Sequence, residues 1–569
     1  MTTELLTPYE RGNKNQTTTW QECIHFYQNL ASRFPQVLKL IEIGTSDGGV
    51  PLHAGVVASD GLHDLNEIKR TRRPVFFNNN GIHPGEPEGI DACMALVRDF
   101  CTDSARLAAL NNVVFLFVPI YNVDGCKNRN AGSRVNQVGP EFFGFRGNAL
   151  NLDLNRDFIK CDSLNAQAFN RFFSAWDPDV MVDTHTSNGA DYSYTMTVIQ
   201  TQADKLGGAL GQFLRDHMMP TLSQKMTARG WPFCPYVNPV HDIPDDGIED
   251  FLETPRFSTG YAALNHTLGM MPETHMLKPY ADRYESMRAL VEEVLAYTVA
   301  NAAQIQALRQ DARAADAHRR QWPLQWKVNR NKPSKFRFRG FTAVYSPSQL
   351  GNYTRLSYDR SKPWEKDIDY FQHFEQSVTV AAPGYYVIPQ EWRDVIERLQ
   401  WNGLSMERVT EATAQVVQTL HIKKISTRPT PYEGHMFHDE IETDERTEMI
   451  TLKPGDYLLS LNQPKARYAV ETLEPLAHDS FFRWGFFNSI LEKKETFSDY
   501  VFEDTASELL ETEPDLKDQF NQWKKENPHR LSDQTAVLNF IFSHCRKYAE
   551  PEWLRYPVYR IMQDMAGLR

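Results

Sequence analysis

Apolar residues in the N-terminal half of the chain alternate between short continuous runs and longer stretches with helical spacing. The runs at residues 74–77, 113–120, 179–185 and 268–275 predict strands that are covered on both faces, as in a parallel or mixed sheet. Between them, stretches such as 90–100 repeat apolar residues with the period of a helix. This alternation predicts an α/β fold with a mixed, mostly parallel central sheet and helices on both faces.

The pattern changes after residue 320, where short segments with strand-like composition replace the alternation. We expect these strands at residues 335–345, 376–388, 415–425, 446–452, 455–461 and 466–473. The final ninety or so residues return to helical periodicity. Because 569 residues exceed what one hydrophobic core usually organises, we predict an α/β domain at 1–318, a β-rich accessory domain at 319–478 and a helical C-terminal region at 479–569.

Composition narrows the class of protein. The apolar fraction of 41% and the charged fraction of 24% are typical of globular domains, and the net charge of −12 argues against a nucleic-acid or membrane-surface binder. The sequence contains no run of eighteen apolar residues, so no membrane span is predicted. The seven cysteines include no Cys-x-x-Cys pair, which favours free thiols. The first eight residues lack the pattern of a signal peptide. We therefore expect a cytoplasmic protein, or a periplasmic or secreted one whose signal has been removed.

The loop at residues 78–89, Asn-Asn-Asn-Gly-Ile-His-Pro-Gly-Glu-Pro-Glu-Gly, lies between a predicted strand and a predicted helix. A loop in this position lies at the carboxyl end of the strands, which is the edge of the sheet where open α/β folds place their sites. Its Gly and Pro residues bend the chain so that His83 and Glu86 can point to one position, as two of the three protein ligands of a catalytic zinc site do. His185 ends another predicted strand at the same edge and is the candidate third ligand. A single histidine in such a place is more often a buried core residue.

Sequence motifs between these candidate ligands favour a ligand role for His185 over a core histidine. Residues 122–125 read Asn-Val-Asp-Gly, residues 151–158 read Asn-Leu-Asp-Leu-Asn-Arg-Asp-Phe, and Arg146 lies between them. In this order the sequence resembles the zinc carboxypeptidases of the M14 (carboxypeptidase A-like) family. That family has a His-x-x-Glu, an Asn-Pro-Asp-Gly-like turn, an Asp-x-Asn-Arg-Asn-Phe segment, a later His and a late Glu. The match covers residues 75–280, about a third of the chain.

The resemblance implies a Zn²⁺ cofactor held by His83, Glu86 and His185. It also implies that Asn155 and Arg156 bind the free C-terminal carboxylate of a peptide. An arginine fork suits such a carboxylate, because it can pair with both oxygens.

The remaining implied roles concern the reaction itself. Arg146 would stabilise the oxyanion, for which a well-placed donor typically supplies about 3 kcal/mol, with Arg134 as the alternative. Glu273 would be the general base that takes a proton from water. Tyr261 would cap the bound substrate, with Tyr236 as its rival.

Other acidic and histidine residues have weaker interpretations. Asp183 and Glu88 are candidates for orienting a metal ligand. His435 and His438, which are flanked by acids, are more typical of a solvated loop than of a second metal site. The acidic residues between 242 and 253 could favour basic substrate side chains, although such runs are usually solvated.

The resemblance therefore implies a zinc-dependent metallopeptidase that removes C-terminal residues from peptides. Two alternatives keep the same metal chemistry. They are a succinylglutamate desuccinylase or aspartoacylase-like amidohydrolase acting on N-acyl amino acids, and a cell-wall peptide hydrolase. A third alternative, a peptide- or glycan-binding protein on a degenerate peptidase scaffold, is disfavoured by the complete set of candidate residues. The segment 183–189, Asp-Thr-His-Thr-Ser-Asn-Gly, departs from the usual family sequence of His-Ser followed by an aromatic residue.

Overall fold

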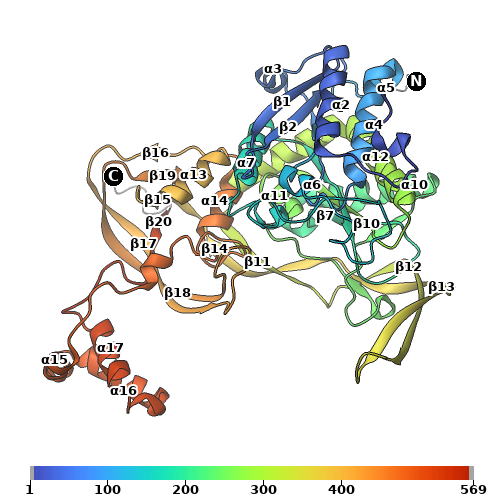
Figure 1. Ribbon diagram of the computed structural model, residues 1–569. Coiled ribbons are helices and arrows are strands. Elements are labelled where there is room, and N and C mark those ends of the chain that lie inside the picture. The colour runs from blue at the N-terminus through green and yellow to red at the C-terminus, as the bar shows by residue number, and fades with distance from the viewer. Residues whose placement is uncertain (1–4, 563–569) are drawn as a thin grey trace.

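The structure is a computed structural model that describes residues 5–562. An α/β part occupies the upper right of Figure 1, and a β-rich part lies beside it. A long hairpin of β12 (Ser334–Pro347) and β13 (Thr354–Phe371) extends from the α/β part at the lower right. No helix in the described range is both long enough and apolar enough to cross a bilayer.

The α/β part is built on one nine-stranded sheet with the order β1-β2-β4-β3-β5-β10-β7-β8, in which β6 also pairs with β10. Strands β3 and β4, β3 and β5, β5 and β10, β6 and β10, and β7 and β8 run parallel, whereas the β1–β2, β2–β4 and β7–β10 pairs are antiparallel. The predicted mixed, mostly parallel sheet is confirmed. Its strands are β1 (Leu38–Thr45), β2 (Pro51–Val57), β3 (Val75–Asn79), β4 (Val114–Val118), β5 (Val180–Asp183), β6 (His185–Ser187), β7 (Met196–Gln200), β8 (Phe233–Pro235) and β10 (Leu268–His275).

Alternating side chains of the strands enter different cores, because successive residues of a strand point to opposite faces. Phe76 belongs to the core formed with α2, α4 and α12, whereas Phe77 belongs to the core formed with α7 and α11. Helices therefore cover both faces, as predicted. The α-helices of the α/β part are α1 (Pro8–Arg11), α2 (Trp20–Arg33), α3 (Leu65–Arg70), α4 (Glu88–Thr102), α5 (Ser104–Ala108), α6 (Val123–Lys127), α7 (Leu164–Trp176), α8 (Ala203–Leu206), α9 (Gly208–Phe213), α10 (Met219–Ala228), α11 (Ser258–Leu264) and α12 (Tyr280–Ala317).

Local sequence explains where several helices begin. At α2, the Thr19 side chain accepts from the Glu22 backbone N–H, and the Glu22 carboxylate accepts from the Thr19 backbone N–H, forming a capping box. Ser163 caps α7 in a similar way, by accepting from the N–H of Ala166. These caps satisfy backbone donors that the first helical turn leaves free.

The β-rich part contains a six-stranded sheet with the order β16-β19-β15-β20-β17-β18 and a two-stranded sheet of β11 and β14. The hairpin strand β13 also pairs with β9, so the hairpin is attached to the loop that follows β8. The strands are β9 (Ile248–Glu249), β11 (Gln321–Val328), β14 (Phe374–Ala381), β15 (Pro383–Ile388), β16 (Glu407–Arg408), β17 (Thr413–Thr427), β18 (His438–Leu452), β19 (Tyr457–Ser460) and β20 (Arg555–Met562).

Two predicted assignments in the C-terminal half are wrong. Residues 466–473, expected as a strand, form helix α14 (Ala466–Leu473). The helical C-terminal region holds three helices, α15 (Asp499–Thr512), α16 (Pro514–Glu526) and α17 (Gln534–His544), which project at the lower left of Figure 1. It then ends in strand β20, which pairs with β15 and β17 in the β-rich sheet.

The two parts share a hydrophobic core. Trp484 and Phe481 belong to the same buried cluster as Phe77 of the central sheet and Phe169 of α7. Helix α13 (Arg393–Trp401) contributes to it as well. The accessory chain therefore packs against the helical layer of the α/β part, while the predicted boundaries at 318 and 478 stay a prediction.

Candidate metal centre and surrounding cavity

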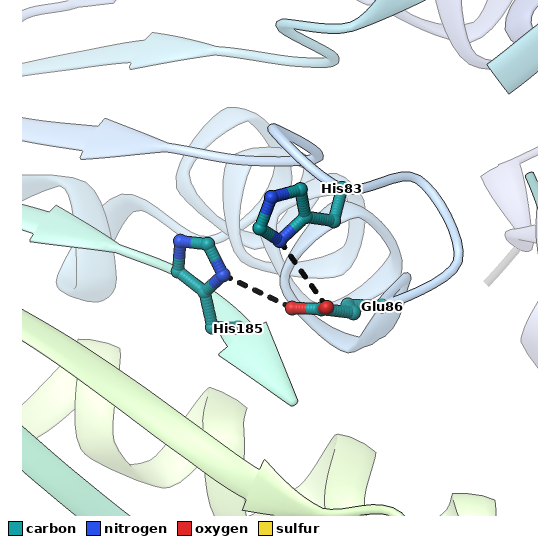
Figure 2. A group of neighbouring side chains, drawn as sticks. All are labelled: His83, Glu86 and His185. Carbon is teal, nitrogen blue, oxygen red and sulfur yellow. Dashed lines mark hydrogen bonds and ion pairs between the residues drawn. The ribbon is translucent and has the colours of Figure 1, made fainter. Parts of the chain in front are cut away.

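His83 and Glu86 lie on the loop between β3 and α4, and both side chains are buried. The loop turns tightly, because the Glu86 N–H donates to the His83 carbonyl oxygen over 2.9 Å. Gly85 fits a crowded position between them, where a Cβ would lie 3.0 Å from the carbonyl oxygen of Gly144. The turn directs the imidazole and the carboxylate toward each other (Figure 2).

His185 reaches the same point as the first residue of β6. Its Nδ1 atom lies 3.0 Å from Glu86 Oε2, and His83 Nδ1 lies 3.2 Å from Glu86 Oε1. Ligand atoms of all three residues lie within 4.8 Å of one another, and no other such group of three occurs in residues 5–562. Two imidazole nitrogens and one carboxylate are a donor set that suits zinc with an open fourth position.

The outward-facing nitrogens of both imidazoles are held by carboxylates. His83 Nε2 lies 2.8 Å from Asp153 Oδ1, and His185 Nε2 lies 3.0 Å from Asp183 Oδ2. A carboxylate at Nε2 favours the tautomer whose Nδ1 lone pair is available to a metal. Asp183 thus occupies the supporting position that the sequence suggests, whereas sequence reasoning did not single out Asp153. The signal for it was its place two residues before Asn155 in the same motif.

Glu88, the other predicted supporting residue, does not contact a ligand. Its carboxylate accepts from Arg283 Nε over 2.6 Å and from the Thr186 hydroxyl over 2.8 Å. Both contacts are with residues other than the two imidazoles, so Glu88 has a structural role next to the site.

Two of the candidate ligands, Glu86 and His185, have strongly shifted pKa values. Burial would raise the pKa of Glu86, but Arg134 and the two imidazoles outweigh it and hold that pKa well below its usual range. Burial opposes the charged form of His185, yet Asp183 and Glu86 raise its pKa well above the usual value. The carboxylates of Asp183 and Glu86 therefore favour the positively charged form of His185.

The structure brings both candidate arginines to the cavity. Arg146 Nε donates to Asp153 Oδ2 over 2.8 Å, and its Nη1 lies 3.3 Å from His83 Nδ1. Arg134 Nη1 pairs with Glu86 Oε1 at 2.5 Å. The side chain of Arg146 is 44% exposed and that of Arg134 only 16%. Arg146 is therefore the more accessible of the two arginines to a bound molecule.

Asn155 and Arg156 line the cavity together, on a short 3₁₀ turn (Leu154–Arg156). The Asn155 side-chain oxygen accepts from the Ser258 N–H over 3.1 Å, and within residues 5–562 no acceptor for its amide nitrogen is found. The Arg156 guanidinium lies 4.4 Å from the centre of the Phe257 ring. Stacking of this kind holds the planar fork in place, and while Nη1 donates to the Asn155 carbonyl oxygen over 2.8 Å, the other N–H groups can pair with an anion.

Glu273 lines the cavity from β10, next to the ligands. Burial raises its pKa to about 8, and although His185 opposes this shift, the charge of Glu86 adds to it. A carboxyl group that titrates near neutral pH is suited to accept and return a proton. The structure thus places Glu273 in the same cavity as the candidate ligands, and its role as the general base stays a prediction.

The prediction that Tyr261 caps the substrate is contradicted. Its side chain is fully buried in α11 and packs against Phe158 and Phe173 with ring centroids 5.4 Å and 5.2 Å apart. Its hydroxyl donates to Asn402 over 2.6 Å. Tyr236, the rival candidate, does line the cavity.

The cavity has a volume of about 360 Å³ and brings together nearly all the predicted site residues. Its wall also contains Glu253, which sequence reasoning treated only as one member of an acidic stretch. The Glu253 side chain is 4% exposed, and burial raises its pKa to about 7 despite a hydrogen bond from Thr259. The cavity is lined by His83, Glu86, Arg134, Arg146, Asn155, Arg156, His185, Thr186, Ser187, Asn188, Ile199, Tyr236, Phe251, Glu253, Phe257, Met271 and Glu273.

Two other acids of the acidic stretch contact the β12–β13 hairpin. Asp245 pairs with Lys366 at 2.8 Å, and Asp250 accepts from the hydroxyl of Tyr370. Only Glu253 of this stretch lines the cavity. Asp245 and Asp250 therefore attach the loop after β8 to the hairpin.

His435 and His438 have separate partners. His435 Nε2 lies 2.7 Å from Asp162 Oδ2, whereas His438 Nε2 lies 2.8 Å from the Asn488 side-chain oxygen. These two histidines do not converge on one point.

Comparison with known proteins adds independent information. Residues 23–199 match the family model of the zinc carboxypeptidases (Peptidase_M14). Carboxypeptidase 2 of Trichophyton rubrum is 23% identical over 439 residues, which cover 74% of this chain and 75% of that protein. Carboxypeptidase 2 of Trichophyton tonsurans is also 23% identical, over 71% of this chain and 72% of its own length.

Solved structures of carboxypeptidases also align with part of the chain. A metallo-carboxypeptidase from Burkholderia cenocepacia aligns with a TM-score of 0.37 and 15% identity, over 50% of this chain and 70% of its own. Carboxypeptidase A from Helicoverpa armigera gives a TM-score of 0.37 and 14% identity, over 50% and 74%.

A mixed α/β sheet with a buried His-Glu-His group at its edge defines the class, that of a metallopeptidase-type hydrolase. Residues 23–199 match the zinc carboxypeptidase (M14) family model, and the curated relatives, which are 23% identical, are named carboxypeptidases, so the chain is similar to this family. The resemblance predicted from the ordered motifs is confirmed.

Proposed function

We propose that this protein is a zinc-dependent carboxypeptidase that removes C-terminal residues from peptides. The observation that supports it most is the geometry at Glu86. The Nδ1 atoms of His83 and His185 both face its carboxylate, while their Nε2 atoms are held by Asp153 and Asp183. This donor set fits zinc, and the chemistry that bound zinc supplies is Lewis acidity toward a carbonyl group and a water molecule.

The protein's own residues would bind the end of the peptide. Arg156, stacked on Phe257, would pair with the C-terminal carboxylate, and the amide nitrogen of Asn155 would donate a second hydrogen bond. Because this pairing needs a free carboxylate, it would fix which peptide bond lies beside Glu273.

Glu273 and Arg146 would act on the reacting atoms. The Glu273 carboxylate would take a proton from the attacking water and pass it to the departing amine. Arg146 would donate to the oxygen of the scissile carbonyl as negative charge develops there. Its held position beside Asp153 means that little reorganisation would be needed.

The test combines metal analysis with peptide hydrolysis. We expect one zinc per chain and cleavage of a peptide with a free C-terminus, but not of the same peptide with a C-terminal amide. Glu273→Gln should keep zinc and lose hydrolysis. Full activity in this variant would contradict the role of Glu273, and a preference for N-acyl amino acids over peptides would favour the amidohydrolase alternative.

A further inference from the structure

A loop of the β-rich part contacts the segment that carries the candidate site. This loop joins β17 to β18, and the Oε2 atom of its Glu433 accepts a hydrogen bond from the backbone N–H of Asp153 over 2.8 Å. The two residues are 280 positions apart. On either side of this contact, Gly434 packs near Leu152, and His435 pairs with Asp162.

Asp153 connects several functional groups. Its Oδ1 atom accepts from His83 Nε2 over 2.8 Å and from the Asn155 backbone N–H over 2.9 Å, while its Oδ2 atom accepts from Arg146 Nε over 2.8 Å. One carboxylate thus positions a candidate metal ligand, the candidate oxyanion donor and the turn that binds the peptide end. Its own backbone N–H donates only to Glu433 among the described residues.

The conformation of Glu433 is unfavourable for its residue type. Glu433 and Gly434 have φ values of +49° and +83°, and hydrogen bonds run in both directions between Tyr432 and His435. Positive φ at both central residues is the requirement of a type I′ turn, which favours Asn-Gly. A glutamate in the left-handed region is strained, and strain at one residue points to a local role for its side chain.

We infer that Glu433 is a positioning residue of the active site, supplied by the accessory part of the chain. It fixes the backbone of Asp153, and through Asp153 it fixes His83, Arg146 and Asn155. This inference rests on the proposed function for its catalytic readout, but its effect on metal binding can be measured without any substrate.

The test compares two substitutions of Glu433. One relieves the backbone strain but loses the contact with Asp153, and the other keeps both. Glu433→Asn relieves the strain, because Asn tolerates positive φ, but its shorter side chain withdraws from Asp153. Glu433→Gln keeps the reach and an acceptor oxygen. Lys14→Asn is a matched control, because Lys14 is an exposed residue with a φ of +61°.

We expect Glu433→Asn to keep or raise the thermal midpoint of the metal-free protein. Its zinc affinity, measured by competition with a chelator, should nevertheless fall about tenfold, as for other residues that support metal ligands indirectly. Its kcat/KM should fall by a similar factor, and Glu433→Gln should lose threefold or less.

Two results would overturn the inference. One is wild-type zinc affinity in Glu433→Asn. The other is an equal loss in both variants together with a lower thermal midpoint, which would show a purely structural role. If the wild type binds zinc but cleaves no peptide, the proposed function fails while the affinity comparison still tests Glu433.

Discussion

Glu273 and His185 lie directly opposite each other on the neighbouring parallel strands β10 and β6. The distance between the proposed base and a candidate metal ligand is therefore set by the backbone pairing of the sheet rather than by a loop. Neighbouring strands are held about 4.8 Å apart. The sheet therefore fixes the backbone of Glu273 beside that of His185, and both side chains line the same cavity.

This proximity predicts that zinc binding releases a proton. Burial raises the pKa of Glu273 to about 8, so the group is largely protonated at pH 7 without metal. A nearby dication favours the charged form. Calorimetry at pH 7 in buffers with different ionisation enthalpies should therefore detect proton release from the wild type and less from Glu273→Gln. Equal release from the two proteins would contradict the assignment.

The same shift predicts how the stability of the metal-free protein depends on pH. The folded pKa of Glu273, about 8, lies above the value of 4.5 for an unperturbed glutamate. Between these two values the folded state binds more protons than the unfolded state, so this group's contribution to stability falls as the pH rises. The free energy of unfolding of the wild type should decline more steeply from pH 5 to 8 than that of Glu273→Gln. Parallel pH profiles, measured by denaturant titration, would count against the raised pKa.

The Asp183–His185 pair predicts an effect on metal affinity. Asp183→Asn keeps the size of the side chain but removes the charge that holds His185 Nε2. We expect about tenfold weaker zinc binding, the lower end of the range for such supporting residues. Asp191→Asn is a suitable control, because Asp191 pairs with Lys278 and Arg360 outside the candidate ligands. A variant at 183 that binds zinc like this control would disprove the supporting role.

A residue of the candidate site can be predicted from the sequence when the signal for it lies in the neighbouring residues of the chain. His83, Glu86 and His185 could be found because each lies where a strongly apolar strand ends, and strand ends meet at one edge of a parallel sheet. The partnership of Asp153 with His83 spans 70 residues and depends on the path of an irregular loop, which periodicity does not encode. Glu433 is still farther away in the chain.

The errors also have physical causes. Tyr261 was placed near the substrate by its distance from Glu273, but it lies on a short helix whose neighbours Ala262 and Leu264 are buried. Residues 466–473 do carry Arg467 and Glu471 one helical turn apart, but the stretch has only eight residues and all of them are buried, so the helical period was easily taken for a short strand. Strand β20 was missed for a similar reason, because nearly all its residues are buried.

The two arginines give a prediction that separates their roles. If Arg146 stabilises the oxyanion, Arg146→Ala should lower kcat about a hundredfold, equivalent to about 3 kcal/mol, with a small change in KM. Arg134 contacts Glu86 at 2.5 Å and is less exposed, so Arg134→Ala should mainly alter zinc affinity. Steady-state kinetics at saturating zinc distinguishes the two. A larger loss of kcat in Arg134→Ala would reverse the assignment.

Glu253 predicts which C-terminal residues are preferred. Its carboxyl group is buried in the cavity wall, and within residues 5–562 only Thr259 donates to it, always at Oε2. A buried carboxylate without a cationic partner is costly, so a substrate whose last side chain is Lys or Arg should bind better than one ending in Leu.

Glu253→Gln should reduce kcat/KM for the basic substrate about 30-fold, which corresponds to about 2 kcal/mol for a lost buried charge pair, and should affect the Leu substrate little. Glu249→Gln is the matched control, since Glu249 pairs with Arg330 and does not line the cavity. The preference should also weaken below pH 7, because burial raises the pKa of Glu253 to about 7 and the neutral acid does not attract a cation. An unchanged ratio of basic to Leu cleavage in Glu253→Gln would rule out this residue as the determinant.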